Sequence, residues 1–185
     1  MDRSSAAAHK IPADIFPTCP RVVRGIILAR LNPSPSKKAG QILATQACLD
    51  RIHAIEHPMC LVCSQQNPNG LKLKFKVQPD GSVAAVFDCS PWLQSYPNVL
   101  HGGVISAILD SAMVNALFAI GIVAVTATLE VRYLAPTVTG RFAMARAWTE
   151  SADAHPLYRQ RAELIQDGKV MVEAKAKFVV RDSSV

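Results

Sequence analysis

Residues 97–120 combine a polar, glycine-containing opening with a long apolar run that carries one acidic side chain. The segment reads Pro-Asn-Val-Leu-His-Gly-Gly and continues with apolar residues, and Asp110 is its only charged residue. A buried carboxylate costs free energy unless it is used, so the function of the protein is sought first at Asp110. Gly102 and Gly103 stand where a helix should begin, and backbone N–H groups at a helix start suit an anion or a developing oxyanion.

The acid and the glycine pair lie too far apart on one helix to act on the same small group. Eight residues separate Gly102 from Asp110, which corresponds to about 12 Å at the rise of an α-helix. If both serve one carbonyl carbon, the N–H must come from one subunit and the carboxylate from another. A two-fold homodimer supplies such a pair of antiparallel helices, so we expect self-association.

The apolar run predicts one long helix over residues 101–120. Its apolar side chains fall on every face of a helix rather than in one stripe, which indicates that protein surrounds most of it. The length of 20 residues also fits a membrane span. The central Asp110, the glycine pair and the strand-like sequences on both sides favour a helix enclosed by a sheet, so no membrane span is expected.

Extended segments are predicted on both sides of this helix. Residues 71–77 alternate apolar and basic side chains, which places the odd-numbered residues on the core side of a strand. Sequences typical of hairpin turns occur at 79–82 and 167–168. An amphipathic helix is expected at 41–56, and further strands are expected at 83–89, 123–134, 141–151, 157–166 and 169–180. This order predicts an α+β fold in which a curved, mostly antiparallel sheet wraps around one long central helix.

The positive charge of the chain is concentrated at its start. The formal net charge is +6, and residues 1–39 hold seven Lys and Arg against two Asp, a net +5. Residues 40–185 are therefore nearly neutral, which argues against nucleic acid as a partner. We expect a variable basic extension over 1–39 and one domain over 40–185. No signal peptide opens the chain, and the apolar stretch 22–31 is too short and basic for an anchor, so a cytoplasmic location is expected.

Cysteine usage indicates free thiols rather than a disulfide framework. The chain has five cysteines, an odd number, and no secretory signal. Cys60 and Cys63 form a Cys-x-x-Cys motif, and Cys48 and His57 upstream are conceivable further ligands. A structural zinc site usually adds a second tight ligand pair, and the sequence shows none, so no metal is expected.

Three segments together resemble the hotdog-fold acyl-CoA thioesterases of the phenylacetate-pathway (PaaI-like) type. The first is His-Gly-Gly at 101–103 with an acid nine positions after the histidine, and the second is Thr-Ala-Thr-Leu-Glu-Val-Arg-Tyr-Leu-Ala-Pro at 126–136. The third, Cys-Leu-Val-Cys at 60–63 with Asn-Pro-Asn-Gly-Leu at 67–71, is similar to an opening found in a subgroup of this family. The resemblance covers residues 60–180 and implies a hotdog fold.

The resemblance also implies catalytic roles. Asp110 would act as general base or nucleophile on a thioester, and Gly103, with Gly102 beside it, would polarise the thioester carbonyl. His101 would orient the loop or assist the carbonyl. Some members carry Asn or Gln six positions before the histidine and Thr three positions after the acid, where this chain has Ser95 and Met113. The nearest local substitutes for these water-positioning groups are Thr126 and Ser111.

Substrate contacts are expected along the strand after the helix. Strict alternation puts Thr126 on one face with Thr128, Glu130 and Arg132, and Val125, Ala127, Leu129, Val131 and Tyr133 on the other. By resemblance, the CoA moiety would meet the end of this strand, at Arg132, Tyr133 and Leu134, where a guanidinium suits phosphate recognition. The acyl group would lie against apolar helix residues such as Met113, Val114 and Leu117. Asn98 and Ser111 complete the expected binding residues.

The predicted function is therefore hydrolysis of an acyl- or aryl-CoA, with CoA as part of the substrate and no other cofactor. The protein would associate as a homodimer or homotetramer with sites at the subunit boundary. Two alternatives share the fold. One is an enoyl-CoA hydratase or dehydratase, in which the helix acid and a histidine move protons. The other is a non-catalytic acyl-CoA binding protein.

Overall fold

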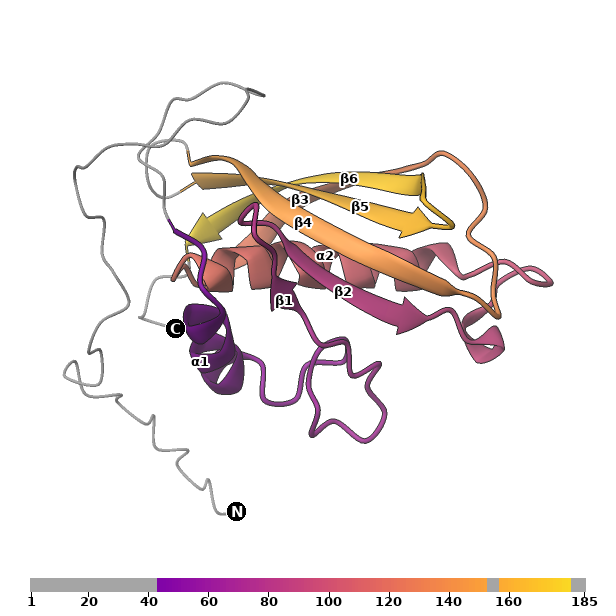
Figure 1. The fold of residues 1–185 in the computed structure, drawn as a ribbon, viewed down its shortest axis with the longest axis horizontal. Coiled ribbons are helices and arrows are strands. Elements are labelled where there is room, and N and C mark those ends of the chain that lie inside the picture. Colours follow the sequence, from indigo (N-terminus) through magenta and orange to yellow (C-terminus); the bar gives the residue numbers. More distant parts are fainter. Residues whose placement is uncertain (1–42, 153–156, 181–185) are drawn as a thin grey trace, which may run out of the picture. The chain divides into compact units, whose positions relative to one another are not determined.

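The computed structural model describes residues 43–152 and 157–180, which form an antiparallel sheet packed against one long helix (Figure 1). The predicted extension over 1–39, including the stretch 22–31, lies outside the described residues. The elements in chain order are α1 (Gln46–Glu56), β1 (Lys76–Val77), β2 (Val83–Asp88), the short 3-10 helix η2 (Pro91–Leu93), α2 (Gly102–Ala119), β3 (Ala124–Tyr133), β4 (Phe142–Ala152), β5 (Leu157–Gln166) and β6 (Lys169–Val180).

The six strands form one sheet in the order β1-β2-β4-β5-β6-β3, and all neighbouring strands are antiparallel. The β5–β6 hairpin turns at Asp167 and Gly168, whose φ angles are +51° and +74°. Two consecutive positive φ angles are typical of the tight turn that suits strand twist, which explains the Asp-Gly pair. The predicted α+β class, with a curved sheet around a central helix, is confirmed. Among the described strands, β1 and β3 form the two edges.

The core lies between α2 and the inner face of the sheet. The largest α2 side chains there, including Ile108, Leu109 and Leu117, are fully buried. The opposing strands present small side chains, because Ala145, Ala147, Ala162 and Ala174 on β4, β5 and β6 are all buried. Small residues on the sheet allow the bulky helix to approach closely.

Within the described part of the chain, α2 is the one helix long and apolar enough to cross a membrane by length and composition. Protein surrounds 67% of that segment. Such burial is typical of a core helix. It agrees with the prediction that the sheet encloses this helix.

The predicted helix at 41–56 begins later than expected. Thr45 has an extended backbone and caps α1, with its Oγ1 accepting the Cys48 N–H at 3.2 Å. Leu49 and Ile52 are buried as predicted, but Leu43, upstream of the cap, is 71% exposed. A side chain that caps the backbone stops the helix from extending toward the N-terminus.

The strand predicted at 71–77 is only partly paired with the sheet. Its alternation is confirmed, because Leu73 and Phe75 are buried between exposed lysines. Only Lys76–Val77 pairs with β2. The earlier residues instead bond to the preceding loop, through Leu71 N–H to Leu61 O at 2.8 Å and Leu73 N–H to Val62 O at 2.9 Å.

A β-bulge in β3 overturns one predicted face assignment. Thr126 pairs with Phe178 and Thr128 pairs with Lys177, so Ala127 is the extra residue. Paired residues share a face of a sheet, and Phe178 is fully buried, so Thr126 lies on the α2 side. The strict alternation that grouped Thr126 with Thr128, Glu130 and Arg132 is therefore wrong at Thr126. It is also wrong at Val125, which was grouped with Leu129 and Tyr133 but pairs with Val179 on the outer face.

Candidate active site

His101 closes the N-terminal end of α2 with its own side chain. It is the N-cap residue, and its Nδ1 accepts the Gly103 N–H at 2.9 Å. A neutral imidazole that accepts at Nδ1 carries its proton at Nε2, so the Nε2–H is free to donate. A Cβ on Gly103 would lie only 3.1 Å from the His101 ring, which explains why glycine stands there.

The end of β3 lies across the first turn of α2. The Tyr133 hydroxyl donates to Gly102 O at 2.8 Å and lies 2.8 Å from Ser106 Oγ. A Cβ on Gly102 would approach the Tyr133 oxygen to 3.2 Å. The structure therefore brings together four of the predicted site residues, His101, Gly102, Gly103 and Tyr133, around the helix start.

Asp110 lies two turns further along α2 and is held by β3. Thr126 Oγ1 donates to Asp110 Oδ1 at 2.7 Å. Burial raises the pKa of Asp110 above the usual value of 3.8, and nearby Cys60 raises this pKa further. The Thr126 hydroxyl and His57 lower the pKa and so offset part of this rise. A carboxyl with a raised pKa is a better proton acceptor than an ordinary aspartate once it is ionised. Thr126, named from the sequence as a substitute water-positioning group, therefore contacts the acid directly.

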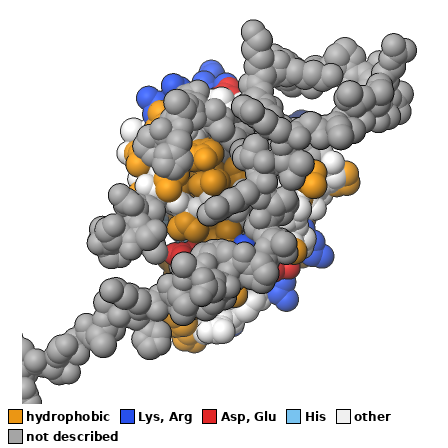
Figure 2. Space-filling view, turned by 90° about the vertical axis from the view of Figure 1, so that its left-hand side faces the viewer, with side chains coloured by type: hydrophobic (Ala, Val, Ile, Leu, Met, Phe, Trp, Pro, Cys, Tyr) orange, Lys and Arg blue, Asp and Glu red, His pale blue; other side chains and the backbone are white. Residues whose placement is uncertain are grey.

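Asp110 is on the less covered side of α2. Gly103 is exposed, and Ser106, Ala107 and Asp110 are half-buried, at positions that form one strip along the helix. On the same side of β3, Leu129 is 36% exposed and Tyr133 is 50% exposed. This strip and the adjoining edge strand give the acid access to a ligand or to another chain. Hydrophobic side chains also gather on the face seen in Figure 2, with Lys and Arg toward its margins.

The remaining predicted residues are distributed differently. Arg132 and Thr128 are exposed on the outer face of β3, where Arg132 pairs across the strands with Glu173. Leu134 follows β3 and is 45% exposed. Asn98 is exposed in the turn before α2, with a positive φ of 62°.

Two predicted binding residues are not on the exposed strip. Met113 is fully buried in the core. Ser111 is 5% exposed and lies near Cys63 rather than near a ligand at the helix start. Ser111 directly follows Asp110 and is turned about 100° away from it around the helix. Met113, three residues after Asp110, shares the side of α2 that carries 106 and 110 but is covered there.

A second chemical cluster, at His57, Cys60 and Cys63, packs against the same helix. The ligand-type atoms of these three residues lie within 4.8 Å of one another, and His57 Nδ1 is 3.4 Å from Cys63 Sγ. A hydrogen bond from Cys63 lowers the pKa of Cys60, and the same pairing raises the pKa of Cys63. The predicted free thiols are confirmed for Cys60, Cys63 and Cys89 and are wrong for Cys48, which is disulfide-bonded.

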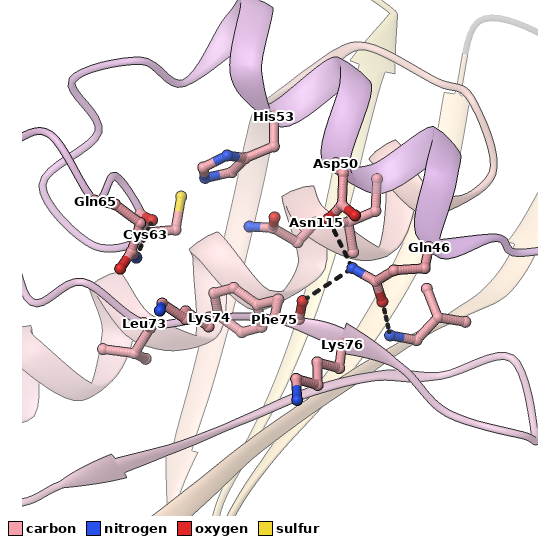
Figure 3. A pocket seen from close by; sticks show the side chains of 12 residues that line it. Gln46, Asp50, His53, Cys63, Gln65, Leu73, Lys74, Phe75, Lys76 and Asn115 are labelled. Atoms are coloured by element: carbon pink, nitrogen blue, oxygen red, sulfur yellow. Dashed lines mark hydrogen bonds between the residues drawn. The ribbon is translucent and has the colours of Figure 1, made fainter.

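A cavity of about 460 Å³ lies between α1, β1 and the Cys63 end of this cluster. His53, Cys63 and Asn115 point into it (Figure 3). Asn115 is fully buried, and its Oδ1 has no hydrogen-bond partner among the described residues. We did not predict Asn115 or His53 from the sequence. The sequence did carry a signal for Asn115. Burying its amide in an otherwise apolar helix costs free energy, as burying the Asp110 carboxylate does.

Comparison with known proteins finds similarity to thioesterases in part of the sequence and in the fold. The sequence profile of the thioesterase superfamily matches residues 97–155, which hold the helix start, Asp110 and β3. No protein of curated function matches the chain in sequence. A crystal structure of a thioesterase superfamily protein is similar, with 26% identity and a TM-score of 0.60 over 64% of this chain. The chain spans 61% of the length of that protein.

Two further solved structures show the same fold at lower identity. PaaI of Escherichia coli, from the phenylacetic acid degradation operon, has 18% identity and a TM-score of 0.55 over 59% of this chain and 83% of its own. A Streptococcus mutans protein with bound acetyl CoA has 17% identity and a TM-score of 0.54 over 59% of this chain and 88% of its own. The hotdog architecture predicted from the sequence is therefore confirmed.

The environment of Asp110 predicts that Asp110→Asn stabilises the protein at neutral pH. Because the folded-state pKa is raised, the folded protein holds the Asp110 proton more tightly than the unfolded chain does. Stability is thus greatest below the ordinary pKa and is lost as pH rises toward the raised pKa. Asparagine removes the buried charge and can still accept the Thr126 hydrogen bond.

Urea denaturation at pH 7 and near pH 3.8 measures this effect. We expect a higher free energy of unfolding for Asp110→Asn at pH 7, and a difference that shrinks toward zero at the acidic pH. Asp88→Asn, at an exposed position of β2, is the matched control and should change stability less. A destabilised Asp110→Asn protein at pH 7 would contradict the assigned cost of burial.

Proposed function

We propose that this chain, a PaaI-like hotdog-fold protein of the thioesterase superfamily, hydrolyses the thioester of an acyl- or aryl-CoA to a free acid and CoA. The observation that carries the proposal is the half-buried Asp110, held at 2.7 Å by Thr126 on the open side of α2. This acid lies within the segment that matches the superfamily profile. The similar protein with bound acetyl CoA supports a CoA ester as the substrate class.

Asp110 would supply the base. Its carboxylate takes a proton from water while the water oxygen bonds to the thioester carbon, and the C–S bond then breaks. The sulfur of CoA leaves as a thiolate and receives the proton from Asp110. In the other version, the carboxylate oxygen bonds to the carbonyl carbon, the C–S bond breaks and CoA leaves as a thiolate that takes a proton from solvent. Water then hydrolyses the mixed anhydride, which releases the free acid and regenerates the Asp110 carboxylate. Both versions need ionised Asp110, and Thr126 holds the carboxylate in place for either.

The start of α2 would stabilise the negative charge that develops on the carbonyl oxygen. Gly103 N–H is our proposed donor, with Gly102 N–H beside it, as in the family resemblance. In this conformation the Gly103 N–H donates to His101 Nδ1. The N–H can donate to the substrate carbonyl when this bond is shared between the two acceptors or broken. The His101 Nε2–H is a third donor at the same helix end.

We further propose that each site combines the helix start of one subunit with Asp110 of another. The helical rise keeps these groups about 12 Å apart within one chain. The open strip of α2 and the free edge of β3 provide a surface for a second copy, because a two-fold axis there sets two α2 helices side by side in opposite directions. The partly exposed Leu129 and Tyr133 would be covered by this contact.

The two ends of the substrate would meet different parts of the surface. Arg132, exposed at the end of β3, is our proposed contact for CoA phosphates, and Tyr133 and Leu134 flank it. Thr128 and Asn98 are further proposed contacts. The acyl group would lie beside the half-buried strip of α2; the buried Met113 and Leu117 would then form the layer beneath the acyl group.

Asp110→Asn is expected to lower the hydrolysis rate by about 10²–10⁴, the usual contribution of a general base. Release of free thiol from short, aromatic and long acyl-CoAs measures the rate, and Asp88→Asn should keep wild-type activity. The wild-type rate should rise with pH through the raised pKa of Asp110, because the ionised form is the active one.

Three outcomes would contradict this assignment. Asp110→Asn could keep most of the wild-type rate in a folded protein. Turnover of enoyl-CoA without thiol release would identify a hydratase instead. Binding of acyl-CoA without any turnover, unchanged in Asp110→Asn, would identify a non-catalytic binding protein.

A shared site predicts that two impaired variants restore activity when their chains mix. Dimers that contain one Asp110→Asn chain and one His101→Ala chain keep one site with both groups intact. Random pairing should restore roughly a quarter of wild-type activity, because about half of the dimers are mixed and one of their two sites is complete. Co-expression with different affinity tags and purification on both tags isolates the mixed species. Light scattering at the assay concentration gives the mass of the active species. An active monomer of 20.0 kDa would exclude the shared site.

Arg132→Ala is expected to raise KM for CoA esters roughly tenfold, the scale of one lost charge-assisted contact. A truncated thioester that lacks the nucleotide should show a smaller change. Arg141→Ala removes another exposed arginine, ion-paired with Asp167 at 2.6 Å, and serves as control. An equal rise in KM for the CoA ester and for the truncated thioester would mean that Arg132 supports β3 rather than binding phosphate.

A further inference from the structure

We propose that His57, Cys60 and Cys63 form a binding site for one zinc ion, a site separate from the proposed hydrolytic chemistry. The sequence alone led us to expect no metal, because the Cys-x-x-Cys pair lacked a second ligand pair. The fold supplies a third ligand by placing His57, at the end of α1, beside both cysteines. Thiolate and imidazole ligands are the set that zinc prefers in proteins.

The spacing of the three ligand atoms fits a tetrahedral ion. Zinc–sulfur and zinc–nitrogen bonds of about 2.3 and 2.0 Å separate neighbouring ligand atoms by about 3.5–3.8 Å. His57 Nδ1 lies 3.4 Å from Cys63 Sγ, and all three ligand atoms are within 4.8 Å of one another. Binding therefore needs only small side-chain adjustments.

The loop that carries the cysteines is already ordered by hydrogen bonds. Ser64 Oγ donates to Pro58 O and accepts the N–H groups of Gln66 and Asn67, at 3.0 and 3.2 Å. A loop held this way loses little conformational freedom when an ion binds.

The surroundings leave a fourth coordination position for water. The amide of Asn115, on α2, lies against Cys63, and its fully buried Oδ1 has no partner among the described residues. An unsatisfied buried acceptor indicates a missing donor, and a metal-bound water is a donor of the right kind. The cavity beside Cys63 and Asn115 has room for it (Figure 3).

Binding would release the thiol protons to solvent and leave two thiolates and a neutral imidazole on the ion. The His57 ring also packs edge-on against Phe118 of α2, with ring centroids 4.9 Å apart. The ion would therefore connect the end of α1, the 60–63 loop and α2. This is a structural role, because the ion stabilises the packing that backs the Asp110 helix.

Metal analysis of the full-length protein, purified in the presence of a non-thiol reductant, tests the site. We expect about one zinc per chain in the wild type and its loss in Cys60→Ser and Cys63→Ser. Cys89→Ser is the matched control, because Cys89 is a buried free cysteine outside the cluster, and it should keep the ion. Equal zinc in the wild type and in both cluster variants would overturn the proposal.

Cobalt substitution keeps the test decisive if the serine variants do not fold. Titration of the wild-type apoprotein with Co²⁺ should produce thiolate-to-cobalt charge-transfer absorption that saturates at about one equivalent, and Cys89→Ser should behave identically. Absence of that absorption in folded wild-type protein would overturn the site. A chain lighter by two hydrogens after mild oxidation, with no bound zinc before it, would identify a redox pair instead and also overturn it.

Discussion

The cost of burying a carboxylate in an apolar helix explains how the elements around α2 are arranged. One side of α2 packs bulky residues against alanines of the sheet and leaves no place for Asp110. The acid must therefore lie on the less covered side, where the Thr126 hydroxyl reaches it at 2.7 Å. That contact requires β3 to run alongside α2 at the edge of the sheet. The same arrangement keeps the acid open to a ligand, so the feature that limits the cost also gives access.

The periodic pattern of apolar residues predicted the helices and strands whose pattern is long and regular. The bounds expected for α2 and for β3 to β6 agree with the structure to within one residue, because their apolar periodicity is long and regular. The start of α1 was missed because the Thr45 cap interrupts a sequence that remains amphipathic upstream. The bulge at Ala127 was missed because one extra small residue leaves no mark in the alternation of polar and apolar side chains.

The sequence predicted those residues of the candidate site that stand out by themselves. It did not predict the contacts that form only when the fold brings separate segments together. Asp110, the glycine pair and His101 stood out because a charge and two glycines interrupt an apolar run. His57 was named from the sequence as a conceivable further ligand of the Cys60–Cys63 pair. Its approach to both cysteines depends on the end of α1 and on a loop held by side-chain hydrogen bonds, which spacing alone does not encode. Both clusters contact α2, so the helix connects the proposed chemistry with the proposed ion.

The bulge in β3 has a consequence for how this protein can change during evolution. Substitutions at Ala127 leave the register of the strand intact, because the extra residue has no partner on β6. Deletion of Ala127 would leave Thr126 opposite Phe178 and Thr128 opposite Lys177, so the strand would pair without interruption and Thr126 would stay beside Asp110. Loss or gain of a residue in the paired part of β3 would instead turn the residues on one side of it to the opposite face of the sheet. Beside the acid, Ala127 is therefore the position of β3 at which a change of residue type, or the loss of the residue, disturbs the strand least.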